Sequence, residues 1–444
     1  MSRIGFALSA TLGLFAAASV AAQDSGSAGP SPAAVAATAR SPEPKTCVLS
    51  PYWKDTYRPT PAFKNQTRAP APPPSAPFNV ETLASGLVNP WAMAFLPDGK
   101  ILVTERPGRM RILDKGVLSD PVQGLPPIKP IGGMGLFDVA LDPDFARNRT
   151  LYFDYFSPAP GEPATPETGR TRLSDWLKLP LSDRENHKIG NQRFASAKLS
   201  ADGKRLEDVR VLIDGGMDGR VVVGPDGYLY ATAGAPAGGD VDVDGLPQDL
   251  GIDYGKVLRI AKDGSVPKDN PFVGRAGARP EIYALGFRDP QGAAINPRTG
   301  KMWTIEHGPR GGDELNMIEP GGNYGFPTIS YGREYSEKLI SNGATAKEGL
   351  RQPVYFWTPS IAPSGLMFYT GDMFPAWKGS AFVGSQGVKR LVRLQMDGDK
   401  VVAEEHLLND LCQRIRDVRQ GPDGAIYLLT ESASAEILRL TPKR

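Results

Sequence analysis

The stretch Gly224-Pro-Asp-Gly-Tyr-Leu-Tyr-Ala-Thr232 joins a tight turn to a short run of apolar and aromatic residues. Pro-Asp-Gly favours a turn, and the alternating run that follows is typical of a β-strand. The same unit recurs as Leu96-Pro-Asp-Gly99 before residues 100–105, Asn296-Pro-Arg-Thr-Gly300 before residues 301–306, and Gly421-Pro-Asp-Gly424 before residues 425–430. Other short runs, at residues 110–113, 150–155 and 392–394, also have strand character, and no long amphipathic helix is evident.

A turn-strand unit that recurs through residues 78–444 predicts an all-β fold, and specifically a β-propeller. At roughly 45–65 residues per blade, six blades fit best and seven are possible. The rival architecture is a pair of β-sandwiches, but no linker divides residues 78–444. A propeller closes its ring by pairing the first strand with the last blade, so we expect the two ends of the domain to meet.

Composition divides the chain into three parts. Residues 1–22 carry a positive charge near their start, at Arg3, followed by an Ala-rich apolar run that ends in small residues. This pattern indicates a signal peptide. A transmembrane anchor is the alternative, but the run is short for a membrane span. Residues 23–76 are rich in Ala and Pro and are interpreted as a disordered or loosely docked linker, although the aromatic residues within 47–57 allow that part to dock. Residues 77–444 form the predicted propeller.

The charge and cysteine content narrow the class of protein. A net charge of +2 gives no indication of a nucleic-acid or anionic-membrane partner, and three His residues make a His-based metal cage unexpected. The signal peptide predicts export, to a periplasm or to the medium, with no transmembrane anchor in the mature chain. Cys47 and Cys412 are the two cysteines, and in an exported chain they either pair as a disulfide or remain free thiols.

Two loops concentrate polar side chains on backbone rich in Gly and Pro. The first is His307-Gly-Pro-Arg-Gly-Gly-Asp-Glu-Leu-Asn316 with its continuation to Pro327, and the second is Gly286-Phe-Arg-Asp-Pro-Gln-Gly292. Unusual backbone loaded with charge is typical of a site displayed on a rigid scaffold, so both loops are predicted to line one pocket. The plainer interpretation is two ordered turns with solvated charges.

These motifs resemble a known family. The stretches 83–95, 135–145, 248–260, 287–292, 306–316, 357–365 and 414–418 follow, in order, the pattern of the glucose/sorbosone dehydrogenases, which are soluble sugar dehydrogenases that depend on pyrroloquinoline quinone (PQQ). The resemblance implies a six-bladed propeller. It also implies a sugar substrate, PQQ in the central channel and a Ca²⁺ ion beneath the quinone.

The resemblance assigns residues to each group. The Ca²⁺ ligands would be the main-chain carbonyls of Gly308 and Pro309, which suit a hard cation. Arg288, Arg414 and Arg416 match positions that hold the carboxylates of PQQ, a role that the planar guanidinium fits. Three further positions match residues near the cofactor or the sugar: Asp289, Trp357 and Thr358.

The chain departs from the family pattern where the chemistry occurs. Gly216 stands where the family has its catalytic His, and Ala235 stands where an acidic residue is expected. Gly133 and Gly387 replace a Gln and a Lys, with Lys389 two positions after the latter, and Asp289 replaces an Asn.

The missing His raises the question of a substitute base. Losing a positioned general base costs about 10²–10⁴ in rate. Asp218, two residues after Gly216, is the candidate substitute if burial raises its pKa. Its alternative role is that of a turn Asp. Of the histidines, His307 is expected to orient its loop, while His187 and His406 are expected to lie away from the site.

Three functions remain open at this point. The first is an exported PQQ- and Ca²⁺-dependent aldose sugar dehydrogenase that oxidises its sugar at C1 by hydride transfer, with an electron acceptor that the sequence does not identify. The second is a non-catalytic propeller that binds a sugar, a glycan or a protein. The third is a hydrolase or lactonase in which Asp289, Asp313 and Glu314 supply metal ligands.

Overall fold

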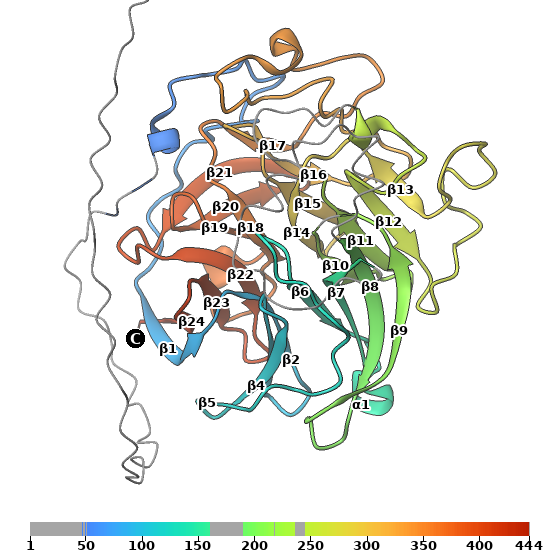
Figure 1. The fold of residues 1–444 in the computed structure, drawn as a ribbon. Coiled ribbons are helices and arrows are strands. Elements are labelled where there is room, and N and C mark those ends of the chain that lie inside the picture. Colours follow the sequence, from blue (N-terminus) through green and yellow to red (C-terminus); the bar gives the residue numbers. More distant parts are fainter. Residues whose placement is uncertain are drawn as a thin grey trace, which may run out of the picture. The chain divides into compact units, whose positions relative to one another are not determined.

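The computed structural model describes residues 47 and 49 and residues 51–159, 190–216, 218–235 and 245–443. The predicted signal peptide and His187 lie outside these residues. The described residues form six four-stranded sheets in which every neighbouring pair of strands runs antiparallel. The all-β, six-bladed propeller is therefore confirmed, and Figure 1 shows the sheets following one another in chain order.

Each sheet is one blade, numbered here from the innermost strand outward. Blade 1 holds β2 (Pro90–Phe95), β3 (Ile101–Glu105), β4 (Arg109–Asp114) and β5 (Val117–Leu118). Blade 2 holds β6 (Leu136–Leu141), β7 (Thr150–Pro158), β8 (Gly190–Leu199) and β9 (Leu206–Asp214). Blade 3 holds β10 (Val221–Val223), β11 (Leu229–Ala233), β12 (Lys256–Ile260) and β13 (Ile282–Leu285).

The second half of the ring repeats this plan. Blade 4 holds β14 (Pro290–Ile295), β15 (Met302–Glu306), β16 (Asp313–Met317) and β17 (Tyr355–Trp357). Blade 5 holds β18 (Pro363–Phe368), β19 (Ala381–Ser385), β20 (Leu391–Asp397) and β21 (Lys400–Leu407). Blade 6 holds β22 (Arg414–Gln420), β23 (Ile426–Glu431), β24 (Ala435–Pro442) and β1 (Phe78–Leu87). Because β1 pairs with β24, the start of the domain closes the ring, as predicted.

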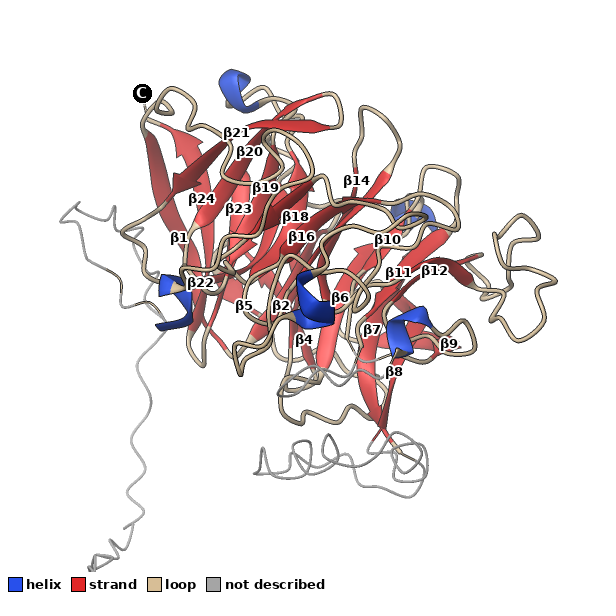
Figure 2. Cartoon of the chain, turned by 90° about the horizontal axis from the view of Figure 1, so that it is seen from above, coloured by secondary structure: helices blue, strands red, loops and turns tan. Residues whose placement is uncertain are grey.

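Helices are few and short among the described residues, as Figure 2 shows. They are α1 (Phe145–Asn148) and the 3₁₀ turns η1 (Pro51–Lys54), η2 (Leu246–Gln248), η3 (Ile340–Gly343) and η4 (Pro375–Trp377). None of the described helices has the length and apolar character needed to cross a membrane.

The Pro-Asp-Gly turns join the first and second strands of their blades. In blade 3 the Gly224 amide donates to the Tyr228 carbonyl at 2.8 Å, and Asp226 accepts the Tyr230 hydroxyl at 2.8 Å. Gly227 has a φ of +84°, a conformation that glycine adopts without steric cost. The strand predicted at residues 228–232 is β11, and the other three units give β3, β15 and β23. The hydrophobic core then fills the spaces between successive blades.

Residues 51–77 contact the propeller although their composition is that of a linker. Asp55 is buried, and its carboxylate pairs with Arg310 at 2.8 Å and with Arg333 at 2.6 Å. Gln66 is fully buried and donates to the Pro353 carbonyl at 2.9 Å, and the Ala69 amide donates to the Tyr355 hydroxyl at 2.9 Å. This segment is called the strap below. It crosses blades 4 and 5 before it enters β1.

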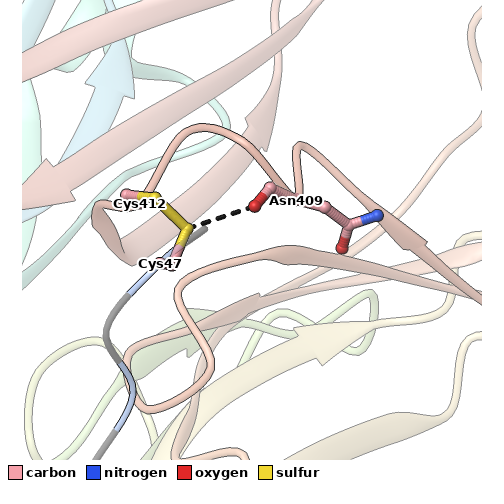
Figure 3. Close-up of a disulfide and its surroundings, with 3 residues drawn as sticks. All are labelled: Cys47, Asn409 and Cys412. Carbon is pink, nitrogen blue, oxygen red and sulfur yellow. Dashed lines mark hydrogen bonds between the residues drawn. A yellow bond between two sulfur atoms is a disulfide. The ribbon is translucent and has the colours of Figure 1, made fainter. Parts of the chain in front are cut away.

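A disulfide joins Cys47 to Cys412, so the pairing that the sequence left open is resolved (Figure 3). Cys412 lies between β21 and β22, where blades 5 and 6 meet. The Asn409 carbonyl oxygen lies 3.2 Å from the Cys47 sulfur. The bond therefore ties the chain, four residues before the strap begins, to the junction of these two blades.

A buried arginine occupies the centre of the ring. Arg220 precedes β10 and has a side chain that is 1% exposed. Its guanidinium donates to the Gln291 carbonyl of blade 4 at 2.8 Å, to the Arg416 carbonyl of blade 6 at 3.2 Å and to the Ser364 hydroxyl of blade 5 at 3.4 Å.

The charge of Arg220 is balanced by two buried carboxylates. Asp138 of blade 2 and Asp417 of blade 6 each lie 3.4 Å from its guanidinium, and Trp91 of blade 1 lies beneath it at 5.7 Å. All six blades therefore contact this one side chain.

We expect Arg220→Ala to lower the free energy of unfolding by about 3–5 kcal/mol, because it leaves buried carboxylates and carbonyls without their cation. Urea denaturation followed by fluorescence measures the change. The exposed Arg210, replaced in the same way, is the control and should have a near-zero effect. A loss below 1 kcal/mol for Arg220→Ala would show that Arg419, which also pairs with both carboxylates, is sufficient.

Candidate functional site

The polar loops of blades 3, 4 and 6 meet at the face of the channel where the innermost strands begin. Gln291, the second residue of β14, connects them. Its side-chain amide donates to Asp218 Oδ2 at 2.8 Å and to Asp289 Oδ1 at 2.5 Å, while its oxygen accepts from Arg416 at 2.9 Å. Thus Asp218, Asp289 and Arg416, each selected from the sequence, lie around a single glutamine.

The two carboxyl groups on Gln291 differ in acidity. Burial, with the charge of Asp289 as a second cause, raises the pKa of Asp218 to about 7. Burial also disfavours ionisation of Asp289, but His307 and Arg288 outweigh it and lower the pKa of Asp289 to about 2. Near neutral pH, Asp289 is therefore a fixed anion, whereas Asp218 exchanges its proton. Such a division suits a general base beside a permanent charge.

His307 lies between the two predicted loops. Its Nδ1 is 3.5 Å from Asp289 Oδ2, and its Nε2 is 2.9 Å from the Pro363 carbonyl oxygen. Since a carbonyl only accepts, Nε2 carries a hydrogen and is not available as a base in this arrangement. Its main-chain amide donates to the Asp289 carbonyl at 3.0 Å, so His307 holds the loops of blade 4 together.

Four arginines surround the mouth of the channel. Glu431 accepts from Arg416 at 2.8 Å and from Arg414 at 3.0 Å, and Arg106 lies 3.4 Å from the same carboxylate. Arg288 binds the His307 carbonyl at 3.0 Å. Burial lowers the pKa of Arg416 to about 10, so it remains a cation at neutral pH. Three guanidinium groups on one carboxylate leave an excess of positive charge.

Several buried donors at the mouth have no acceptor. Within the described part of the chain, Arg288 Nε, Arg416 Nε and Gln386 Nε2 are buried without a hydrogen-bond partner. Gln386 is adjacent to the cluster, because its oxygen accepts from Arg414 at 2.7 Å. Unpaired buried donors are costly, and together with the excess charge they fit an anionic ligand that carries several carboxylates.

The loop that carries Gly308 and Pro309 is tightly braced. The Gly308 amide donates to Asp313 Oδ1 at 2.9 Å, and Asp313 also accepts from the Ile361 amide at 2.7 Å. A Cβ on Gly308 would lie 2.1 Å from the Gly311 carbonyl oxygen, so the path requires glycine. No group of three His, Cys, Asp or Glu side chains suited to a metal exists among the described residues.

The other predicted residues lie behind this loop or away from it. Trp357 is buried, and its indole N–H donates to Glu404 at 2.9 Å. The Thr358 hydroxyl accepts from the Gly312 amide at 2.9 Å and donates to the Tyr331 carbonyl at 2.9 Å. These contacts support the 308–313 loop from beneath, and none of them joins the Gln291 cluster. His406 lies on β21, where it contacts Glu404 at 2.9 Å.

Four residues of the mouth were not among the site residues selected from the sequence: Arg106, Gln291, Gln386 and Glu431. A signal for one of them was present. The second strands β3, β15 and β23 each end in a glutamate, namely Glu105, Glu306 and Glu431. The turn-strand unit places these glutamates at equivalent positions of three blades. The repeat alone therefore indicated acidic residues at one end of the ring.

The family model of glucose / sorbosone dehydrogenase matches residues 87–439. The chain belongs to the glucose/sorbosone dehydrogenase family. It is 38% identical over 376 residues to aldose sugar dehydrogenase YliI of Escherichia coli, an alignment that covers 83% of this chain and 94% of that protein.

Solved structures of sugar dehydrogenases share this fold. The apo-form of the soluble aldose sugar dehydrogenase from Escherichia coli matches with a TM-score of 0.72 and 36% identity, over 83% of this chain and 100% of that one. The PQQ-bound form of aldose sugar dehydrogenase from Streptomyces coelicolor matches with a TM-score of 0.62 and 25% identity, over 83% of this chain and 99% of that one. The strap precedes the residues that the family model matches.

Gly216, which stands where the family resemblance places a histidine, has no room for a side chain. Its φ is +93°, and a Cβ would lie 2.5 Å from Gln192 Oε1 and 2.7 Å from Ala233 Cβ. Ala235 is buried against Phe326 and Ile340. The surrounding packing therefore matches the small residues found here.

We expect Gly216→His to destabilise the protein and not to increase any sugar oxidation. The strained backbone costs about 1–3 kcal/mol, and the contacts with Gln192 and Ala233 add to it. Gly227→His is a matched control, since Gly227 has a φ of +84° with nothing within 4 Å of a Cβ. Thermal unfolding compares the two variants, and equal losses would show that the space beside Gly216 is open.

We expect Asp289→Asn to lower the pKa of Asp218 below about 7, because the nearest negative charge is removed. Carboxyl ¹³C NMR over pH 3–9 follows the titration. Asp208→Asn, an exposed change beside Lys198, should leave the pKa of Asp218 where it is. An unchanged titration in Asp289→Asn would show that burial alone sets the acidity of Asp218.

Proposed function

We propose that this chain is an exported, PQQ-dependent oxidoreductase that oxidises an aldose sugar at C1, with Asp218 as the general base. The observation that carries the proposal is the position of Asp218. It is held by Gln291, beside Arg416, at the mouth of a channel surrounded by arginines. Membership of a sugar dehydrogenase family supports the substrate class.

The residues at the mouth fit PQQ. The cofactor carries three carboxylates, and the four arginines Arg106, Arg288, Arg414 and Arg416 outnumber the two carboxylates beside them, Glu431 and Asp289. The buried Nε atoms of Arg288 and Arg416 are donors in need of an acceptor. A structure in the same family contains PQQ, which supports the assignment. The carbonyls of Gly308 and Pro309 are the proposed Ca²⁺ ligands.

When bound, PQQ would supply the two-electron acceptor for the hydrogen on C1. The protein's own contribution is the removal of the proton from the C1 hydroxyl. Asp218 would accept that proton, since its pKa of about 7 makes the carboxylate a competent base near neutral pH. Gln291 would fix its orientation by donating to Oδ2. Arg416, bonded to the other end of Gln291, would favour the ionised form.

Export is the proposed location. The sequence of residues 1–22 has the pattern of a signal peptide, and the Cys47–Cys412 disulfide is of the kind that persists in oxidising compartments.

The direct test is to titrate the purified protein with PQQ in Ca²⁺, following the quinone absorbance, and then to add a panel of aldoses with an artificial electron acceptor. We expect saturable binding and sugar-dependent reduction. The rate should rise with pH through about 7 as Asp218 ionises.

We expect Asp218→Asn to lower kcat by about 10²–10⁴ while PQQ binding is retained, because the amide cannot accept the proton. Asp208→Asn is the matched control on an exposed carboxylate and should leave both quantities unchanged.

The possible failures have different meanings. Binding of PQQ without turnover would favour the non-catalytic alternative, a propeller that binds sugar or another partner. This alternative is supported by the closed space at Gly216. The absence of PQQ binding would overturn the cofactor assignment.

A further inference from the structure

The strap brings an aromatic side chain to the rim of the channel. Trp53, in η1, lies directly on Gly387, which follows β19 in blade 5. A Cβ on Gly387 would lie 2.0 Å from the Cη2 atom of the indole and 2.1 Å from Cζ2. No side chain fits at position 387 while Trp53 is in place. The indole therefore occupies the space into which a residue at this position would project.

Gly387 belongs to the rim and is not remote from it. It directly follows Gln386, whose side-chain oxygen accepts from Arg414 of the anion cluster at 2.7 Å. The Gly387 amide donates to the Ile361 carbonyl at 3.0 Å, and two residues later the Pro363 carbonyl meets His307 at 2.9 Å. The indole thus lies on Gly387, whose neighbours along the chain and across its hydrogen bond contact Arg414 on one side and His307 on the other.

Three contacts fix the strap around Trp53. The disulfide holds Cys47, six residues before Trp53. Asp55, two residues after it, is buried between Arg310 and Arg333, and Tyr57 lies beneath the Arg333 guanidinium at 5.5 Å. Arg310 directly follows Pro309. The same ion pair therefore links the strap to the loop proposed to hold the cation.

We propose that Trp53 is a substrate-positioning residue that forms one wall of the sugar site. This inference rests on the proposed function. An indole offers a large, rigid apolar face with an N–H at its edge, which suits the apolar face and the hydroxyl groups of a pyranose. The strap precedes the residues matched by the family model, so this wall would come from a segment outside the matched propeller. It makes sugar selection depend on a segment outside the propeller.

The test compares Trp53→Ala with Trp53→Phe in the PQQ-loaded, full-length protein. We expect Trp53→Ala to raise KM for the preferred aldose roughly tenfold, with kcat and the affinity for PQQ unchanged. Trp53→Phe should restore most of the loss, because it keeps an aromatic face. Phe63→Ala removes an aromatic residue that is 46% exposed on the same strap, and it should change nothing.

Gly387→Ala is the independent variant, since it leaves Trp53 present but displaces the indole. It should raise KM as Trp53→Ala does, and the double variant should be no worse than either single one. A wild-type KM in Trp53→Ala, with turnover intact, would overturn this inference and leave the proposed function standing. The absence of aldose oxidation by the wild-type protein would overturn both. A fall in PQQ affinity with KM unchanged would assign Trp53 to the cofactor instead.

Discussion

The hydrogen bonds of Arg220 are the constraint on which the rest of the structure depends. A guanidinium buried at the centre of a propeller is costly unless its charge and its donors are satisfied. Here Asp138 and Asp417 satisfy the charge, and carbonyls from blades 4 and 6 accept the donors. Those carbonyls belong to Gln291 and Arg416. The side chain of Gln291 donates to Asp218 at the mouth, and the side chain of Arg416 donates to Gln291. Gln291 and Arg416 therefore have two roles: their backbone carbonyls accept from Arg220, and their side chains form part of the candidate site.

The charge balance around Arg220 differs from the charge balance at the mouth of the channel. Around Arg220 the charges are closely balanced, since two arginines, Arg220 and Arg419, share Asp138 and Asp417. At the mouth they are not, because Arg106, Arg414 and Arg416 share Glu431, while Arg288 lies 4.0 Å from the carboxylate of Asp289. Balance favours stability, whereas unneutralised positive charge with unpaired donors favours a bound anion. The balanced charges around Arg220 therefore stabilise the fold, whereas the excess positive charge at the mouth suits the binding of an anion.

The sequence predicted what depends on local geometry. A Pro-Asp-Gly turn needs only its own residues, so β3, β11 and β23 were identified correctly, and the blade count followed from their recurrence. Contacts between blades have no such local signal. Glu431 and Arg106 are separated by 325 positions, and nothing in their spacing indicates that they meet. The strap shows the same limit, because Ala- and Pro-rich composition conceals the single carboxylate of Asp55 that pairs with two arginines of blade 4.

Two of the three glycines that depart from the family pattern are closely packed. At Gly216 the space that a side chain would need is filled by Gln192 and Ala233, and at Gly387 it is filled by Trp53. Random loss of catalytic residues would leave cavities, which cost stability in proportion to their volume. Gly216 and Gly387 each have a neighbour that occupies the space, whereas nothing lies within 4 Å of a Cβ built on Gly133. A carboxyl group with a raised pKa, Asp218, lies two positions after Gly216. The filled space at Gly216 is common to both functions considered above, a dehydrogenase that uses Asp218 as its base and a propeller that binds without turnover, so the activity of Asp218 is what separates them. The space beside Gly387 is filled from the strap, which the Asp55–Arg333 ion pair fastens and which the Cys47–Cys412 disulfide precedes, so in the proposed site this wall would come from outside the six blades.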